Sequence, residues 1–331
     1  MPFLKDLSRL RGKLDGLLLE QAFVRLSQLG QFHPNARPEK HGVEVIKDVP
    51  YRDSSLVEHR LDVYRPVERK GPLPVVLYVH GGAFCILSKE THWIMALAFA
   101  RRGYLVFNIN YRLAPKNKFP AGLEDVCRCY EWLGKNVELW GGDPERVNLA
   151  GESAGANLVT ALSIATSYER PEPWARAAFE AGIQPRAVVP SCGIFQVTDT
   201  QRFERMGKYP RWVTRHLSDI ERHYVGGVEP AHERALDLAN PLAHFERGET
   251  PARPLPRYFV ACGTKDVLLD DSRRLKSALD KTGATCKLVV YPGELHAFNA
   301  FVWRDAAKDY WKQCHDFLGE SLAPSPSLTS A

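Results

Sequence analysis

Long apolar runs, paired cysteines and metal-binding signatures are missing from this chain of 331 residues. Its longest apolar runs have only the length of a strand, so we predict no membrane-spanning segment. The seven cysteines include no CxxC pair, and no HExxH-like spacing occurs, so we predict free thiols, no metal and no metal-dependent hydrolysis. The basic residues are scattered despite a net charge of +5, which argues against nucleic-acid binding.

We also predict no secretion signal at the N-terminus. The apolar run Leu17–Leu19 ends at once in Glu20, which is too short for a signal, and the spacing of leucines before it is helical. Together with unpaired cysteines, this favours a cytoplasmic protein. The sequence leaves a homodimer open.

Strand and helix patterns alternate through most of the chain. A nearly all-apolar strand is expected at 73–80, and alternating patterns follow it at 93–102, 104–110, 123–136, 146–150, 154–166 and 187–190. Such alternation predicts an α/β protein with a mostly parallel central sheet flanked by helices. The alternation breaks at 194–250, which has helical patterning and is interpreted as an insertion. It resumes with a strand at 258–263, a helix at 270–282, a strand at 287–291 and a helix at 301–318.

The most informative motif is Gly-Glu-Ser-Ala-Gly at 151–155, between a predicted strand and a predicted helix. G-x-S-x-G at such a junction is typical of the nucleophile elbow of serine hydrolases. The serine sits on a sharp, strained turn, and the glycines leave room for neighbouring backbone that a Cβ would fill. We therefore predict Ser153 as a catalytic nucleophile.

A base and an orienting acid are expected later in the chain, on turns that follow successive strands. Asp266 follows the strand at 258–263, and His296 follows the last predicted strand and a Pro-Gly turn. Asp270 and Asp271 are rivals for the acid, but they fit better as acidic residues in the first turn of a helix. We predict the order Ser153, Asp266, His296 as a catalytic triad.

A glycine-rich loop, His80-Gly81-Gly82-Ala83-Phe84, follows the apolar strand at 73–80. Backbone N–H groups of such a loop, with that of the residue after the nucleophile, form an oxyanion hole. We assign the hole to Gly81, Gly82, Ala83 and Ala154, with Gly82, Ala83 and Ala154 as donors and Gly81 as the hinge. His80 is interpreted as a residue that braces the loop.

Several motifs together resemble the hormone-sensitive-lipase-like family of α/β hydrolases, the bacterial family IV carboxylesterases. They are HGGAF at 80–84, YRLAP at 111–115, FPA at 119–121, Glu124-Asp125, GGDP at 141–144, GESAG and His296-Ala297-Phe298. Two departures are Ala83, where the family has a third glycine, and DVLLD at 266–270, where it commonly has DPLRD. Glu152 takes the variable place in the elbow, a position that in this family more often supports the loop than performs chemistry.

The resemblance implies an α/β-hydrolase fold with a helical cap, and no cofactor. We expect an N-terminal helical cap segment at 1–40, core parts at 41–193 and 251–320, a helical cap insertion at 194–250 and a disordered tail at 321–331. Aromatic residues of the insertion, namely Phe203, Tyr209 and Trp212, are expected to pack the cap onto the core rather than line a pocket.

The implied activity is that of a serine carboxylesterase acting on short- to medium-chain esters through an acyl-enzyme. An amidase or formamidase with the same triad is an alternative that the residues leave open. A non-catalytic ligand-binding protein, as in plant gibberellin receptors that have lost the histidine, is disfavoured by the presence of His296. The expected partner is a small-molecule ester.

Overall fold

The computed structural model describes residues 36–227 and 234–321, together with residues 25, 27, 30 and 33. The helices expected before residue 36 fall outside these ranges, except that residues 25, 27 and 30 are described and are helical. The tail expected after residue 321 is also outside them. Among the described residues, no helix is both long enough and apolar enough to cross a membrane.

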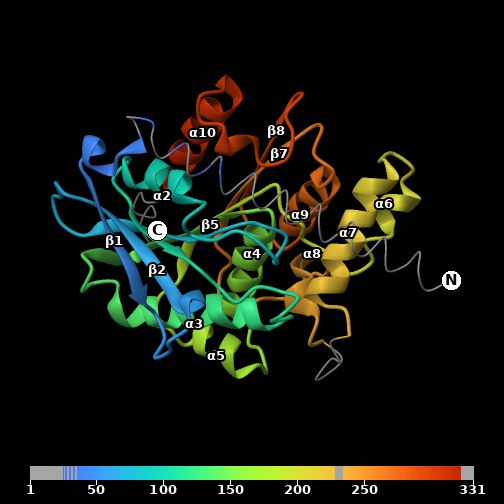
Figure 1. Ribbon diagram of the computed structural model, residues 1–331. Coiled ribbons are helices and arrows are strands. Elements are labelled where there is room, and N and C mark those ends of the chain that lie inside the picture. Colours follow the sequence, from blue (N-terminus) through green and yellow to red (C-terminus); the bar gives the residue numbers. More distant parts are fainter. Residues whose placement is uncertain are drawn as a thin grey trace, which may run out of the picture.

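One eight-stranded sheet forms the centre of the molecule, with the order β1-β2-β4-β3-β5-β6-β7-β8 (Figure 1). The strands are β1 (Val43–Pro50), β2 (Arg60–Pro66), β3 (Leu73–Val79), β4 (Leu105–Ile109), β5 (Gly142–Glu152), β6 (Pro185–Ser191), β7 (Arg257–Gly263) and β8 (Cys286–Tyr291). The pairs β1–β2 and β2–β4 are antiparallel, and every other pair is parallel. The predicted α/β class with a mostly parallel sheet is confirmed.

Helices cover both faces of this sheet (Figure 1). The core helices are α2 (Trp93–Ala100), α3 (Ala121–Asn136), α4 (Ala154–Ser167), α5 (Pro173–Phe179), α9 (Leu269–Lys281) and α10 (Asp305–Ser321). Side chains of α2 and α10 share one apolar cluster with one face of the strands, and α3, α4, α5 and α9 share another with the opposite face. Alternate strand residues therefore enter different cores, which explains why β3, β4, β6 and β7 are mostly apolar on both faces.

Two details of the helices differ from the sequence-based expectation. The helix α5 was not predicted, and its seven residues begin at Pro173, a residue suited to a first helical turn. The last helix begins at Asp305 rather than at 301, because a short 3₁₀ turn at Phe298–Ala300 comes first.

The segment between β6 and β7 contains no strand within its described residues. It forms α6 (Arg202–Arg205), α7 (Arg211–Tyr224), a 3₁₀ turn at Asp237–Ala239 and α8 (Pro241–Glu246). Figure 1 shows α6 and α7 projecting to one side of the sheet, beyond α8 and α9. Three buried residues of α7 join the core cluster on the face of α4. They are Leu217, Ile220 and Tyr224.

Candidate active site

The carboxyl ends of five parallel neighbours, β3, β5, β6, β7 and β8, lie along the same edge of the sheet. Loops that follow parallel strands at this edge are where ligands and catalytic groups gather in open α/β sheets. Each residue predicted from the sequence as part of the site lies directly after one of these strands. The sheet therefore brings chain segments that are distant in sequence to a common place.

Ser153 lies between the end of β5 and the start of α4, with φ 55° and ψ −117°. A non-glycine residue in such a conformation is strained, by roughly 1–3 kcal/mol, and needs support from its surroundings. That support includes the Ser153 N–H, which donates to the carbonyl of Ser191 at 3.0 Å. A Cβ on Gly151 would lie 2.7 Å from the carbonyl of Val79, and one on Gly155 only 2.1 Å from it. The two glycines of the motif are thus required by the close approach of β3.

The loop at 80–84, called here the oxyanion loop, follows β3 and faces Ser153. Gly82, Ala83 and Phe84 all have positive φ, at 116°, 53° and 62°. A Cβ on Gly82 would lie 2.0 Å from the carbonyl of Ile86. Within the described parts of the chain, the N–H groups of Gly82, Ala83 and Ala154 donate to no protein acceptor. These three donors are therefore available to a bound group.

Gly81 differs from its neighbours because its N–H donates to Glu152 Oε1 at 2.7 Å. It cannot serve a ligand at the same time, which agrees with the interpretation of Gly81 as the hinge of the loop. His80, the preceding residue, is buried and stacks on Tyr111 with ring centroids 4.4 Å apart. Burial lowers the pKa of His80 to about 3, so the ring is neutral.

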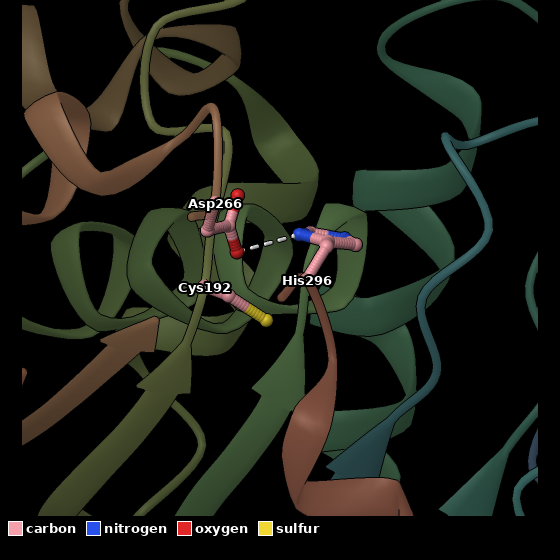
Figure 2. A group of neighbouring side chains, drawn as sticks. All are labelled: Cys192, Asp266 and His296. Atoms are coloured by element: carbon pink, nitrogen blue, oxygen red, sulfur yellow. Dashed lines mark hydrogen bonds and ion pairs between the residues drawn. The ribbon is translucent and has the colours of Figure 1, made fainter. Parts of the chain in front are cut away.

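Asp266 and His296 are joined by a hydrogen bond of 2.8 Å between Oδ2 and Nδ1 (Figure 2). Asp266 follows β7 and is buried, and its Oδ1 accepts the Leu268 N–H at 2.9 Å. The His296 side chain is 41% exposed. Because Nδ1 is bonded to Asp266, Nε2 is the nitrogen free to exchange a proton. Among the described residues, the Ser153 hydroxyl makes no hydrogen bond to His296, a contact that commonly tightens only in the substrate complex.

The two groups shift each other's titration. Burial acts to raise the pKa of Asp266, but the charge and hydrogen bond of His296 and the Leu268 N–H hold it below its usual value. Desolvation acts to lower the pKa of His296, but Asp266, with a smaller contribution from Cys192, raises it well above 6.5. A carboxylate that stabilises a protonated imidazole is the arrangement a general base requires.

A buried acid beside Ser153, Glu152, makes more contacts in this region than the sequence indicated. Besides the Gly81 N–H, Glu152 contacts His92 Nε2 at 2.7 Å and accepts a hydrogen bond from the Tyr78 hydroxyl. Burial raises the pKa of Glu152 to about 8 and lowers that of His92 to about 4. Tyr78 and His92 were not predicted as part of the site, since neither belongs to a motif and only the folded sheet brings them to Glu152.

Among the described residues, neither rival carboxylate forms a hydrogen bond or an ion pair with His296. Asp270 and Asp271 are in the first turn of α9, as expected. Asp271 is buried, accepts the N–H groups of Phe195 and Gln196 at 3.0 and 3.2 Å, and pairs with Arg202 at 2.8 Å. It therefore ties α9 to the start of the segment between β6 and β7, a role that its position in the sequence did not suggest.

The helix α7 lies within electrostatic range of the acid–base pair. The pKa of His216 on α7 is lowered by burial and also by the charge of His296. Of the three aromatic residues expected to pack this segment, Phe203 is fully buried and Tyr209 partly buried. The expectation is wrong for Trp212, which is 75% exposed on the first turn of α7.

Comparison with known proteins places this geometry in a family. The family model described as alpha/beta hydrolase fold matches residues 76–300. The chain therefore belongs to the alpha/beta hydrolase fold family, and the resemblance to its hormone-sensitive-lipase-like branch is confirmed.

Curated relatives include carboxylesterase NlhH of Mycobacterium tuberculosis, which is 35% identical over 151 residues, 44% of each chain. The match thus spans less than half of that relative. An acetyl-hydrolase of Streptomyces hygroscopicus is 30% identical over 254 residues, 76% of each chain. Among solved structures, esterase LipW of Mycobacterium marinum is similar with a TM-score of 0.74 and 22% identity, covering 93% of this chain and 90% of LipW. That last likeness supports the fold alone.

Proposed function

We propose that this protein is a serine carboxylesterase that hydrolyses short- to medium-chain carboxylic esters through an acyl-enzyme. The observation that carries the proposal is the hydrogen-bonded pair Asp266–His296 at the sheet edge that also holds the strained Ser153. The acetyl-hydrolase and carboxylesterase relatives support an ester substrate.

In the first half of the reaction, the Ser153 hydroxyl attacks the ester carbonyl carbon while His296 Nε2 takes its proton. Asp266 keeps the other ring nitrogen protonated and stabilises the imidazolium that forms. The carbonyl oxygen becomes an oxyanion, which the free N–H groups of Gly82, Ala83 and Ala154 would accept. Losing one such donor typically raises the barrier by about 3 kcal/mol.

Collapse of the first oxyanion breaks the bond to the alcohol oxygen, to which His296 returns the proton, and an acyl group remains on Ser153. In the second half, water enters, gives a proton to His296 Nε2 and attacks the acyl carbon. Collapse of the second oxyanion breaks the bond to Ser153 Oγ, which takes the proton back from His296, and releases the carboxylic acid. Every step uses groups of the chain and water.

We further propose that the segment 194–250 forms a helical cap over this site. Tyr224, the last residue of α7, stacks on Phe84 of the loop at 80–84 with ring centroids 3.8 Å apart, which supports a position of α7 beside this site. The apolar side of α7 packs into the core, so the helix is held as part of the folded domain. Such a cap would limit the acyl chain that fits, which is the basis for the expected short to medium length.

The test measures hydrolysis of p-nitrophenyl esters from acetate to palmitate by the wild-type protein, Ser153→Ala and Ser277→Ala. Ser277 is an exposed serine on α9 and serves as the matched control. We expect a loss of about 10⁶-fold in Ser153→Ala and no change in Ser277→Ala. Full turnover in Ser153→Ala would contradict the assigned nucleophile, and hydrolysis of anilides without esters would replace the esterase by an amidase.

A further inference from the structure

Cys192 lies beside the proposed acid–base pair although no step of the reaction uses it. It directly follows β6 and is 1% exposed. Figure 2 shows the side chains of Cys192, Asp266 and His296 converging, each from the segment that follows a different strand. The Cys192 sulfur, an Asp266 carboxylate oxygen and a His296 ring nitrogen all lie within 4.8 Å of one another.

The backbone holds the thiol in this place. Cys192 has φ 41°, in the left-handed region that side chains rarely adopt. Its N–H donates to the carbonyl of Ala261 in β7 at 2.7 Å, which locks the end of β6 to the strand that leads to Asp266. The thiol is therefore positioned relative to Asp266 by the same strand pair that positions the acid.

The three donors define a chemical class of ligand. Thiolate sulfur, imidazole nitrogen and carboxylate oxygen are the ligands that Zn²⁺ takes, whereas Mg²⁺ and Ca²⁺ prefer oxygen alone. Zinc–ligand bonds of about 2.0–2.3 Å separate tetrahedral ligand atoms by roughly 3.3–3.8 Å. The three ligand atoms lie within 4.8 Å of one another, so movements of these side chains would bring them to that spacing. No other group of three such side chains converges in the described ranges.

We propose that Cys192, Asp266 and His296 form a binding site for a thiophilic divalent cation of the Zn²⁺ class, and that the bound cation stops hydrolysis. This inference rests on the proposed function, because it concerns regulation of the same site. The cation would displace the thiol proton, which is released to solvent, and would bind Nδ1 of the neutral imidazole, whose single proton is then carried on Nε2. This breaks the Nδ1–Oδ2 hydrogen bond. With Nε2 protonated, the ring could no longer accept the Ser153 proton. The fourth coordination position would be open to water.

The direct test is the absorption spectrum of the full chain with added Co²⁺, because a thiolate bound to Co²⁺ gives a charge-transfer band in the near ultraviolet. We compare the wild-type protein with Cys192→Ala and Cys192→Ser, and with Cys286→Ala as the control. Cys286 is a partly buried free thiol on β8. We expect the band in the wild type and Cys286→Ala and its loss in both Cys192 variants. The serine variant keeps the test valid if the alanine variant fails to fold.

The second test measures ester hydrolysis against Zn²⁺ concentration in the same proteins. Losing a residue that only supports a metal ligand typically weakens metal binding at least about tenfold. We therefore expect the loss of a direct ligand to raise the Zn²⁺ concentration for half inhibition by at least about that factor. Cys286→Ala should match the wild type. Inhibition unchanged in both Cys192 variants, or no Co²⁺ band in the wild type, would overturn the site.

Ser153→Ala separates this inference from the proposed function. It should lose hydrolysis and keep the Co²⁺ band. If the wild type hydrolyses no ester, the proposed function fails, and the absorption spectrum alone still decides whether the metal site exists.

Discussion

Asp266→Asn is the substitution that most directly probes the proposed acid–base pair. The change keeps the size of a buried side chain and the oxygen that accepts the Leu268 N–H at 2.9 Å. It places an amide N–H against His296 Nδ1, where the carboxylate oxygen now lies at 2.8 Å. The imidazole must then accept at Nδ1 and carry its proton on Nε2, which is the wrong tautomer for taking the Ser153 proton.

The expected loss in kcat/KM for p-nitrophenyl butyrate is about 10⁴-fold, or about 5.4 kcal/mol of transition-state stabilisation. Asp270→Asn is the matched control, since Asp270 lies partly buried in the first turn of α9. We expect it to change kcat/KM by less than about threefold. Retention of more than about a tenth of the wild-type kcat/KM in Asp266→Asn, or an equal loss in the control, would refute the assigned acid.

The pH profile gives an independent reading of the same pair. Hydrolysis needs neutral His296, whose pKa is held well above 6.5 by Asp266. Wild-type kcat/KM should therefore rise with pH through an inflection above about 6.5, and Asp266→Asn should move the inflection downward.

The same two groups make the stability of the fold depend on pH. The stabilisation that comes with the raised pKa of His296 is fully present below about 6.5 and is lost as pH rises through the folded value. The lowered pKa of Asp266 contributes above about 3.9 and is lost as pH falls, so the pair stabilises the fold most between these limits.

Three further substitutions test the surroundings of the site. Gly155→Ala places a methyl 2.1 Å from a carbonyl of β3, so urea unfolding should show a loss of about 3 kcal/mol, and an unchanged midpoint would disprove the close approach. Glu152→Ala leaves the Gly81 N–H buried without its acceptor; we expect about 1–3 kcal/mol less stability and a lower kcat, with Glu152→Gln recovering most of both. Arg202→Leu removes the cation beside buried Asp271 and should cost about 3–5 kcal/mol in urea unfolding, whereas Arg205→Leu, an exposed pair, should cost less than about 1 kcal/mol.

Much of the architecture could be predicted because its signals are local. Each parallel strand is an apolar run, since both faces of the sheet are covered, and each run was found in the sequence within a few residues of its ends. The elbow at 151–155 was equally readable. Its glycines are required because β3 approaches this turn too closely to leave room for a Cβ.

The partners of the site residues were decided only by the tertiary structure. Tyr78 and His92 meet Glu152, and Cys192 meets the acid–base pair, because parallel pairing brings the ends of separate strands to one edge. No spacing of residues along the chain predicts these side-chain contacts. For this reason the sequence predicted no metal ligand, whereas the fold sets three candidate ligands side by side.

The same contrast holds for the segment between β6 and β7. The sequence predicted its helical character and its insertion into the alternating pattern. The sequence did not predict which aromatic residue is buried. Phe203 and Trp212 have similar apolar character, yet Phe203 lies in the core and Trp212 in solvent. The sequence by itself determined which elements form and in what order. Long-range packing, which depends on residues far apart in the chain, decided what each side chain touches.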